Sequence, residues 1–253
     1  MVLPSASEPL WLRHLNGAWM SCCLVDQEIA VRAVVGALAV NAALIAAAVL
    51  LTSELPRRVA AASTVGVLVV GVVGGATAAA PLGAEPARPR QATMSCSAAE
   101  PQVCLWPEHA QELATVTAVA AEASAAWRVV GIAVPSRFTE SLPGPDSASF
   151  GIVNGATRDQ IVMSLATSLM PPWPSCAETD GYPAYPAFDR ARLWLAQLAG
   201  VRTAPQDLGF EEEDVVAVRR VQSAPVEQQR EWFEASRTAL AGCDRPAPAE
   251  PIV

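Results

Sequence analysis

The sequence predicts a two-helix transmembrane hairpin followed by an α-rich (α+β), disulfide-bonded domain outside the cytoplasm. The first observation is a pair of uncharged stretches: 21 residues separate Arg32 from Glu54, and 26 separate Arg58 from Glu85. A helix needs about 20 apolar residues to cross the roughly 30 Å hydrocarbon layer of a bilayer. The second observation is that four cysteines follow both stretches. The third is a series of helix start and stop signals in the remainder of the chain.

The uncharged stretches predict spans at residues 33–52 and 59–80, within a hairpin of residues 31–83. Residues 53–58 leave room only for a tight turn, so both tails lie on one side of the membrane. Two buried helices of a soluble protein are the alternative, but soluble helices rarely run this long without a charge. Charged residues make up 17% of the chain, below the roughly 25% of soluble domains. We therefore expect a multi-pass protein of the cell membrane, with the lipid bilayer as a partner.

The cysteines decide the orientation, because the arginines on the two sides of the spans nearly balance. The favoured pairing is Cys96 with Cys104 and Cys176 with Cys243, although four cysteines allow three connectivities. Zinc binding is the competing interpretation, but the spacing is not that of a zinc knuckle. Disulfides form in oxidising compartments. If they form here, the large domain is extracytoplasmic and the turn at residues 53–58 is cytoplasmic.

Small and polar residues within the expected spans suggest how the helices pack. Gly71 and Gly75 form a GxxxG pair, which lets two helix backbones approach closely. Asn41 lies at mid-depth of the first span. Its amide needs a hydrogen-bond partner, either on a neighbouring helix or within its own helix. Neither span contains an ionisable residue, which argues against an ion relay built from this hairpin alone.

Composition divides the rest of the chain. We expect an N-terminal interfacial segment at residues 1–30, a proline-rich linker at 84–94, the extracytoplasmic globular domain at 95–244 and a disordered tail at 245–253. The formal charge of −8 belongs entirely to the part after residue 84, because the first 84 residues contain four arginines and four acids. This acidity argues against nucleic acid as a partner.

Capping residues and apolar spacing predict five helices and two short strands in the globular domain. Thr157 and Gln160 form a capping box, for example, and Pro171 ends the helix that follows. The expected helices run from Pro107 to Gly131, from Thr157 to Leu169, from Pro186 to Gly200, from Glu211 to Val221 and from Pro225 to Gly242. The expected strands are Ile132 to Val134 and Phe150 to Val153.

Few residues suggest catalytic chemistry. His109 follows Glu108 and invites an acid–base interpretation, but neighbours on a helix point about 100° apart, and a helix-start role is the simpler alternative. The acidic run from Glu211 to Asp214 lacks the alternate spacing of a calcium loop and suits a helix N-terminus. The sequence has no GxSxG, Walker or dinucleotide motif. We therefore predict no catalytic residue, metal ligand or cofactor.

Aromatic residues interleaved with prolines form the most ligand-like segment. These are Trp173, Tyr182, Tyr185 and Phe188. Rigid aromatic loops form grooves for a peptide or a glycan, although such residues also commonly cover a core.

The segment CSAAEPQVCLWPEH, which follows the second span, resembles the start of an uncharacterised extracytoplasmic domain. That domain ends actinobacterial membrane proteins similar to ABC-2-type permeases. The resemblance covers roughly residues 30–243, including the late Trp-Phe helix and Cys243. It implies a membrane location and a transport-associated role with the ABC ATPase on a separate chain, and it supplies no catalytic residues. This chain differs in having two expected spans where such permeases have about six.

The sequence thus favours an integral membrane protein of unknown molecular activity, acting as an accessory or truncated ABC-transporter permease-like subunit with other transmembrane subunits as partners. The alternatives are a membrane-anchored cell-envelope hydrolase and a ligand-binding or sensor module.

Overall fold

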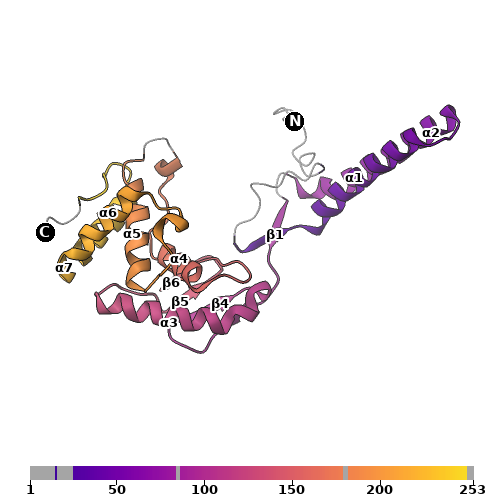
Figure 1. Cartoon of the computed structure of the whole chain (residues 1–253). Helices are drawn as coiled ribbons and strands as arrows, with labels where there is room; N and C mark the ends of the chain where they lie inside the picture. Colours follow the sequence, from indigo (N-terminus) through magenta and orange to yellow (C-terminus); the bar gives the residue numbers. More distant parts are fainter. Residues whose placement is uncertain (1–14, 16–24, 84–85, 179–181, 250–253) are drawn as a thin grey trace. The chain divides into compact units, whose positions relative to one another are not determined.

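The computed structural model describes residues 15, 25–83, 86–178 and 182–249 (Figure 1). The chain forms two compact units that divide between Gln91 and Ala92, within the segment expected to be a linker.

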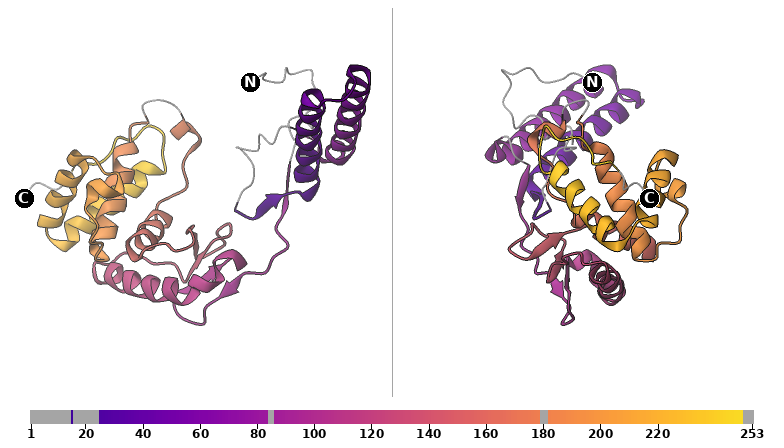
Figure 2. Two further views of the ribbon diagram at one scale, coloured as in Figure 1. Left: turned by 45° about the vertical axis from the view of Figure 1, so that its right-hand side comes forward. Right: turned by 90° about the vertical axis from the view of Figure 1, so that its left-hand side faces the viewer.

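Two long apolar helices form most of the first unit. Helix α1 spans Val31–Thr52, and helix α2 spans Arg57–Ala79 and continues into a 3-10 turn, η2, at Ala80–Leu82. The helices lie side by side in both views of Figure 2. Both are long and apolar enough to cross a membrane, and they contain the two expected spans.

Glycines allow these helices to pack closely. A Cβ atom at Gly75 would lie 2.9 Å from the Gly36 carbonyl oxygen and 2.8 Å from Val40 Cγ2, and one at Gly71 would overlap the Ala43 methyl group. Both glycines of the GxxxG pair therefore face α1, where only a hydrogen atom fits.

Asn41 satisfies its amide within its own helix, because its side chain donates to the Ala37 carbonyl at 2.8 Å. This is the second of the two arrangements expected from the sequence.

A two-stranded antiparallel sheet joins the chain before the hairpin to the chain after it. Strand β1 is Gln27–Ile29 and strand β2 is Ala87–Pro89. Glu28 lies opposite Arg88, whose Nε donates to the carboxylate at 2.8 Å. Most of the expected interfacial segment at residues 1–30 lies outside the described residues, and its described end is strand β1 rather than helix.

The second unit contains a four-stranded sheet in the order β3-β4-β5-β6. Strand β3 (Ser95–Cys96) is antiparallel to β4 (Gln102–Leu105), while β4, β5 (Arg137–Thr139) and β6 (Ser147–Ser149) are mutually parallel. The parallel strands consequently place their carboxyl ends at one edge.

The two predicted strands are wrong in position. The run from Ile132 to Val134 is not a strand, although Ile132 is buried in the core. The prediction at Phe150 to Val153 lies just after β6, and Phe150 is a core residue whose N–H donates to the Thr139 carbonyl. The apolar runs correspond to buried segments, whereas the strands are the segments that pair, β5 with β4 and β6 with β5.

The helices agree better with the sequence. The segment from Pro107 begins as a 3-10 helix, η3 (Pro107–Glu112), and becomes α-helical at α3 (Leu113–Val129), which runs along the sheet in Figure 1. The Thr157–Gln160 capping box is confirmed. The remaining helices are α4 (Arg158–Ser168), η4 (Ser175–Glu178), α5 (Tyr185–Leu198), η5 (Pro205–Leu208), α6 (Glu212–Ser223) and α7 (Val226–Leu240).

Large aromatic side chains fill the core of this unit. Trp127 and Trp194 are fully buried, and each indole N–H has a partner: the Leu195 carbonyl at 2.9 Å and Gln229 Oε1 at 3.0 Å, respectively. Phe233 packs on Trp194 with ring centroids 5.3 Å apart. These contacts join α3, α5 and α7 around one core.

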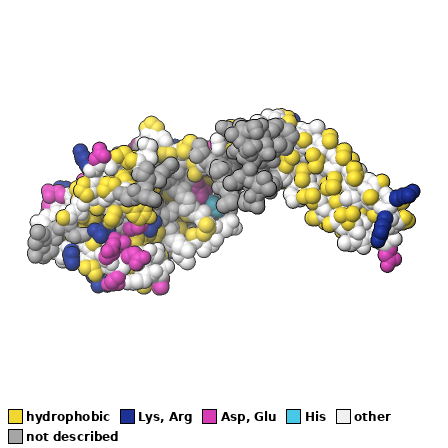
Figure 3. Space-filling view, turned by 90° about the horizontal axis from the view of Figure 1, so that it is seen from above, with side chains coloured by type: hydrophobic (Ala, Val, Ile, Leu, Met, Phe, Trp, Pro, Cys, Tyr) yellow, Lys and Arg dark blue, Asp and Glu magenta, His cyan; other side chains and the backbone are white. Residues whose placement is uncertain are grey.

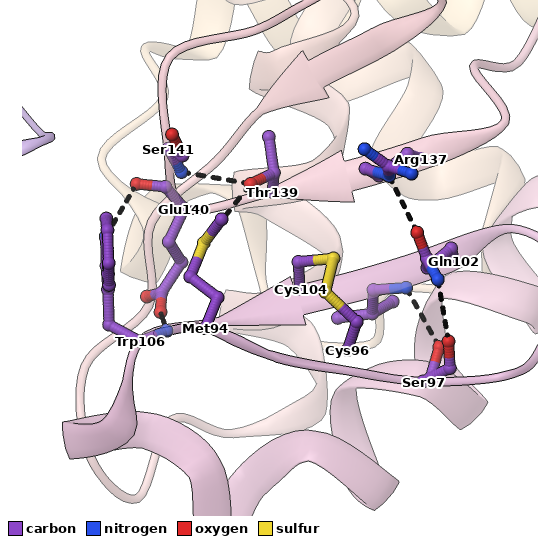
Figure 4. Close-up of a disulfide and its surroundings, with 11 residues drawn as sticks. Met94, Cys96, Ser97, Gln102, Cys104, Trp106, Arg137, Thr139, Glu140 and Ser141 are labelled. Atoms are coloured by element: carbon purple, nitrogen blue, oxygen red, sulfur yellow. Dashed lines mark hydrogen bonds between the residues drawn. A yellow bond between two sulfur atoms is a disulfide. The ribbon is translucent and has the colours of Figure 1, made fainter. Parts of the chain in front are cut away.

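Two disulfides are present, with the pairing that the sequence favoured. Cys96–Cys104 joins directly opposite residues of β3 and β4 (Figure 4). Cys176–Cys243 joins η4 to the chain after α7 across a separation of 67 residues.

Candidate functional site

The four aromatic residues predicted as a ligand surface lie together, and we call them the aromatic surface. The Trp173 ring centroid lies 4.7 Å from that of Phe188, 5.9 Å from that of Tyr185 and 6.0 Å from that of Tyr182. Trp173 comes from the loop between α4 and η4, and the other three come from the start of α5 and the residues before it. Trp173 and Tyr185 are stacked, with their planes 23° apart.

The chain on both sides of Trp173 is held in place. Prolines at 171, 172 and 174 restrict the backbone, and the Cys176–Cys243 disulfide follows directly. The Tyr182 hydroxyl lies 2.8 Å from the Leu240 carbonyl oxygen and 3.0 Å from that of Gly242. Burial raises the pKa of Tyr182. Tyr182 is therefore a buried support for the aromatic surface.

Trp173 and Tyr185 are the most exposed members of the surface. Trp173 is 47% exposed and Tyr185 is 54% exposed. Among the described residues, neither the Trp173 indole N–H nor the Tyr185 hydroxyl has a hydrogen-bond partner. Part of each apolar ring and one polar group on each are thus available to a ligand.

A charged group borders this surface. The Arg192 guanidinium lies 5.3 Å from the Phe188 ring centroid and donates to Asp189 at 3.1 Å. Burial raises the pKa of Asp189, the Arg192 cation opposes the rise, and the nearby Asp214 carboxylate adds to it. Arg190 donates to Asp214 at 2.9 Å. These charges join α5 to α6.

The acidic run behaves as the helix start that the sequence favoured. Glu211 is the N-cap of α6, and the next three acids occupy the first turn. Asp214, the last of them, is buried and paired with Arg190.

His109 has a carboxylate partner that the sequence did not reveal. Its Nδ1 lies 2.7 Å from Oε1 of Glu140, which is 5% exposed. The other oxygen, Oε2, accepts the Trp106 backbone N–H at 2.8 Å (Figure 4). Both partners follow parallel strands, His109 after β4 and Glu140 after β5, at the carboxyl edge where such sheets commonly carry sites.

The His109–Glu140 pair resembles the oriented half of an acid–base site. A carboxylate that holds Nδ1 leaves Nε2 as the atom that takes or gives a proton. In the described part of the chain, no group of three or more His, Cys, Asp or Glu side chains converges as a metal site would require.

The described surface is also hollowed at other places. One hollow, of about 350 Å³, lies on α5 and α6 and is lined by Arg190, Glu212, Glu213 and Arg220, among others. Another, of about 560 Å³, lies along the hairpin and is lined by small residues that include Ala39, Ala42, Gly66 and Gly74.

Fold and site together define a protein with two membrane-length helices and a disulfide-bonded α+β domain. The chain belongs to the family described as Domain of unknown function (DUF7224), whose model matches residues 103–243. The match contains the aromatic surface, the His109–Glu140 pair and the Cys176–Cys243 disulfide. Comparisons with curated proteins and with solved structures found no match.

Proposed function

We propose that this chain is a membrane-anchored protein whose α1–α2 hairpin inserts into the bilayer and holds the α+β domain outside the cytoplasm. The observation that carries the proposal is the arrangement of the hairpin. It packs small residues inward and leaves large apolar side chains exposed, as the yellow surface in Figure 3 shows. Only 22% and 17% of the most apolar stretches of the two helices are buried. Such a surface is unfavourable in water and favourable in lipid.

The cysteines support one orientation. Arg57 and Arg58 are exposed at the start of α2, beside the turn, but Arg32, Arg88 and Arg90 lie near the other end of the hairpin, so the arginines do not decide the orientation. The two disulfides of the domain favour an oxidising compartment. They agree with an exported domain and a cytoplasmic turn.

Within this arrangement, we propose that the hairpin acts as an accessory or truncated subunit of an ABC-transporter permease-like complex, with the ATPase on another chain. Two features support it: the resemblance noted above, and the hollow of about 560 Å³ along the hairpin. Small residues let a further transmembrane helix approach closely.

Membrane topology can be tested with two reporter cysteines in a chain that carries Cys22→Ser and Cys23→Ser. Glu54→Cys lies in the turn, and Val153→Cys is exposed on the domain. In intact cells without an outer membrane, a membrane-impermeant maleimide should label Val153→Cys at once and Glu54→Cys only after permeabilisation. The chain should stay in the pellet after extraction with alkaline carbonate. Recovery in the soluble fraction, or the opposite labelling order, would refute the anchor or its orientation.

A ligand-binding module is the second candidate function, and the stacked, exposed rings of Trp173 and Tyr185 favour it. Such a module and a membrane anchor are compatible, because the surface belongs to the second unit alone.

A cell-envelope hydrolase is the third candidate, and the His109–Glu140 pair favours it. The full chain would be assayed with chromogenic esters and glycosides. If His109 acts as a base, His109→Gln should lower the rate by about 100-fold or more, whereas Asp207→Asn, a change to an exposed carboxylate, should leave it unchanged. A rate that His109→Gln does not alter would exclude this pair as the catalytic one.

A further inference from the structure

We propose that the aromatic surface binds pyranose rings of a cell-envelope polysaccharide, with Trp173 and Tyr185 as the stacking residues. This inference rests on the ligand-binding module proposed above and names its ligand class.

The exposed ring faces suit a sugar. One face of a pyranose presents C–H bonds that carry partial positive charge, and the face of an aromatic ring is electron-rich. Trp173 and Tyr185 are about half exposed and stacked 23° from parallel. Phe188 packs against Trp173 at 4.7 Å and supports it. The two rings cover part of each other, and the exposed part of each can contact one pyranose ring.

The surface is organised before a ligand arrives. Trp173 stands between prolines, and the nearby Cys176–Cys243 disulfide joins its loop to the end of α7. Tyr182 packs against Trp173 and hydrogen-bonds to carbonyls at the end of α7. Rigid contacts lose little conformational entropy on binding, which matters for sugars because their affinities per ring are small.

Polar groups at the edges of the surface can bind sugar hydroxyls. The Trp173 indole N–H and the Tyr185 hydroxyl have no partner among the described residues. The Asp189 and Arg192 side chains, which border Phe188, are each about a quarter exposed. A few polar groups around an apolar face are typical of small-ligand sites.

A peptide fits this surface less well. Peptides that bind by adding a β-strand need backbone donors and acceptors on the protein, and proline residues lack the N–H donor. Five prolines surround the four aromatic residues: Pro171, Pro172, Pro174, Pro183 and Pro186. The negative formal charge of the chain disfavours nucleic acid, whose bases also stack on aromatic rings.

The test is calorimetric titration of the full chain in a detergent without a sugar headgroup. The probes are chitotetraose, cellotetraose and mannotetraose, together with co-sedimentation on purified bacterial peptidoglycan. We expect at least one probe to bind the wild-type chain. Trp173→Ala and Tyr185→Ala should each weaken that binding by tenfold or more, and Trp173→Phe, which keeps a stacking ring, should weaken it by less than about threefold.

The matched control is Val153→Ala, which removes an exposed apolar side chain elsewhere on the domain and should leave binding unchanged. Circular dichroism must show that each variant stays folded. Binding that all three aromatic variants leave unchanged would overturn the proposal, and so would failure of every saccharide to bind.

Two further arms separate this inference from the proposals on which it depends. Trp173-dependent binding of a proline-rich peptide or of lipid vesicles, without binding of saccharides, would overturn the glycan assignment and preserve the binding module. Saccharide binding by a chain that fractionates as soluble would preserve this inference and overturn the membrane anchor.

Discussion

Replacing Asp159 with Asn should destabilise the α+β domain in a way that depends on pH. Asp159 is the second residue of α4, and its Oδ2 accepts three hydrogen bonds from the loop after α5. The donors are the Arg202 N–H at 3.0 Å, the Thr203 N–H at 2.8 Å and the Thr203 hydroxyl at 2.7 Å. The carboxylate thus joins the N-terminus of one helix to the loop that follows another.

The magnitude follows from these contacts. Hydrogen bonds to a charged group contribute about 1.5–3 kcal/mol when buried, but the Asp159 side chain is 15% exposed and an amide oxygen keeps part of the interaction. A carboxylate in the first turn adds about 0.3–1 kcal/mol through the helix dipole. We expect a loss of about 2 kcal/mol at pH 7, which corresponds to a fall in the melting temperature of about 4–8 °C for a domain of this size.

The pH dependence gives the sharper check. Burial alone would raise the pKa of Asp159, but the hydrogen bonds from Thr203 and Arg202 and the Arg158 cation together lower it. A lowered pKa in the folded state stabilises the fold above the unfolded value of about 3.9, and this stability is lost as the pH falls through the folded pKa. The difference between wild type and Asp159→Asn should therefore be full at pH 7 and shrink below about pH 4.

The measurement is denaturant unfolding of the full chain in detergent, followed by tryptophan fluorescence, since five of the seven tryptophans lie after residue 91. Asp207→Asn is the control: Asp207 is exposed, and its side chain has no hydrogen-bond partner within the described ranges. A difference of less than about 0.5 kcal/mol at pH 7, or an equal difference at pH 3 and pH 7, would refute the reasoning.

Three further predictions concern the hairpin, a disulfide and a buried carboxylate. Gly75→Ala should move the two hairpin helices apart and lower the stability of their packing by about 1–3 kcal/mol. Gly74→Ala is the control, because its Cβ would meet nothing within 4 Å. Spin-label distances between the helix ends should increase for Gly75→Ala and stay unchanged for Gly74→Ala. Cys176→Ser, with Cys243→Ser, should destabilise the domain by up to about 4 kcal/mol in denaturant unfolding, because the bridge closes a long loop. Glu140→Gln should keep an oxygen for the Trp106 N–H and lose the charge that faces His109 Nδ1. Because a hydrogen bond to a charged group contributes about 1.5–3 kcal/mol, the free energy of unfolding in denaturant should fall by about that amount, and an unchanged free energy would contradict the contact.

The helices were predictable because the residues at and next to their ends determine where they begin and end. The Thr157–Gln160 capping box begins α4 as expected. Gly131, with a φ of 79°, follows α3 where an L residue with a side chain would be strained. Such signals act within four or five residues and need no knowledge of the tertiary structure.

The strands were not predictable, because β4, β5 and β6 contain only three or four residues each. A period of two is hardly detectable over such lengths. The pairing of Val103 with Phe138 joins residues far apart in the sequence. The strand therefore lies at Arg137–Thr139 and not at the apolar run that begins at Ile132. The sheet depends on pairing between strands that are distant in the sequence, which a local sequence pattern cannot predict.

The aromatic surface was predictable from nearby residues, whereas the His109–Glu140 pair was not. Trp173, Tyr182, Tyr185 and Phe188 lie within 16 positions, so their clustering could be foreseen, while the burial of Tyr182 depends on the end of α7. The His109–Glu140 contact spans 31 positions. The sequence suggested the adjacent Glu108 as the partner of His109. The pairing of β4 with β5 instead brings Glu140 next to His109.

The Cys96–Cys104 disulfide occupies the point where the chain enters the second unit. Cys96 lies outside the family match, which begins at Val103, and Cys104 lies inside it. Strand β3 has two residues, and each net hydrogen bond contributes only about 0.5–1.5 kcal/mol. The backbone hydrogen bonds of so short a strand stabilise its position only weakly, and the covalent Cys96–Cys104 bond to β4 adds to that stability. The bridge therefore fixes the first strand of the domain to the sheet at the point where the backbone contacts are fewest.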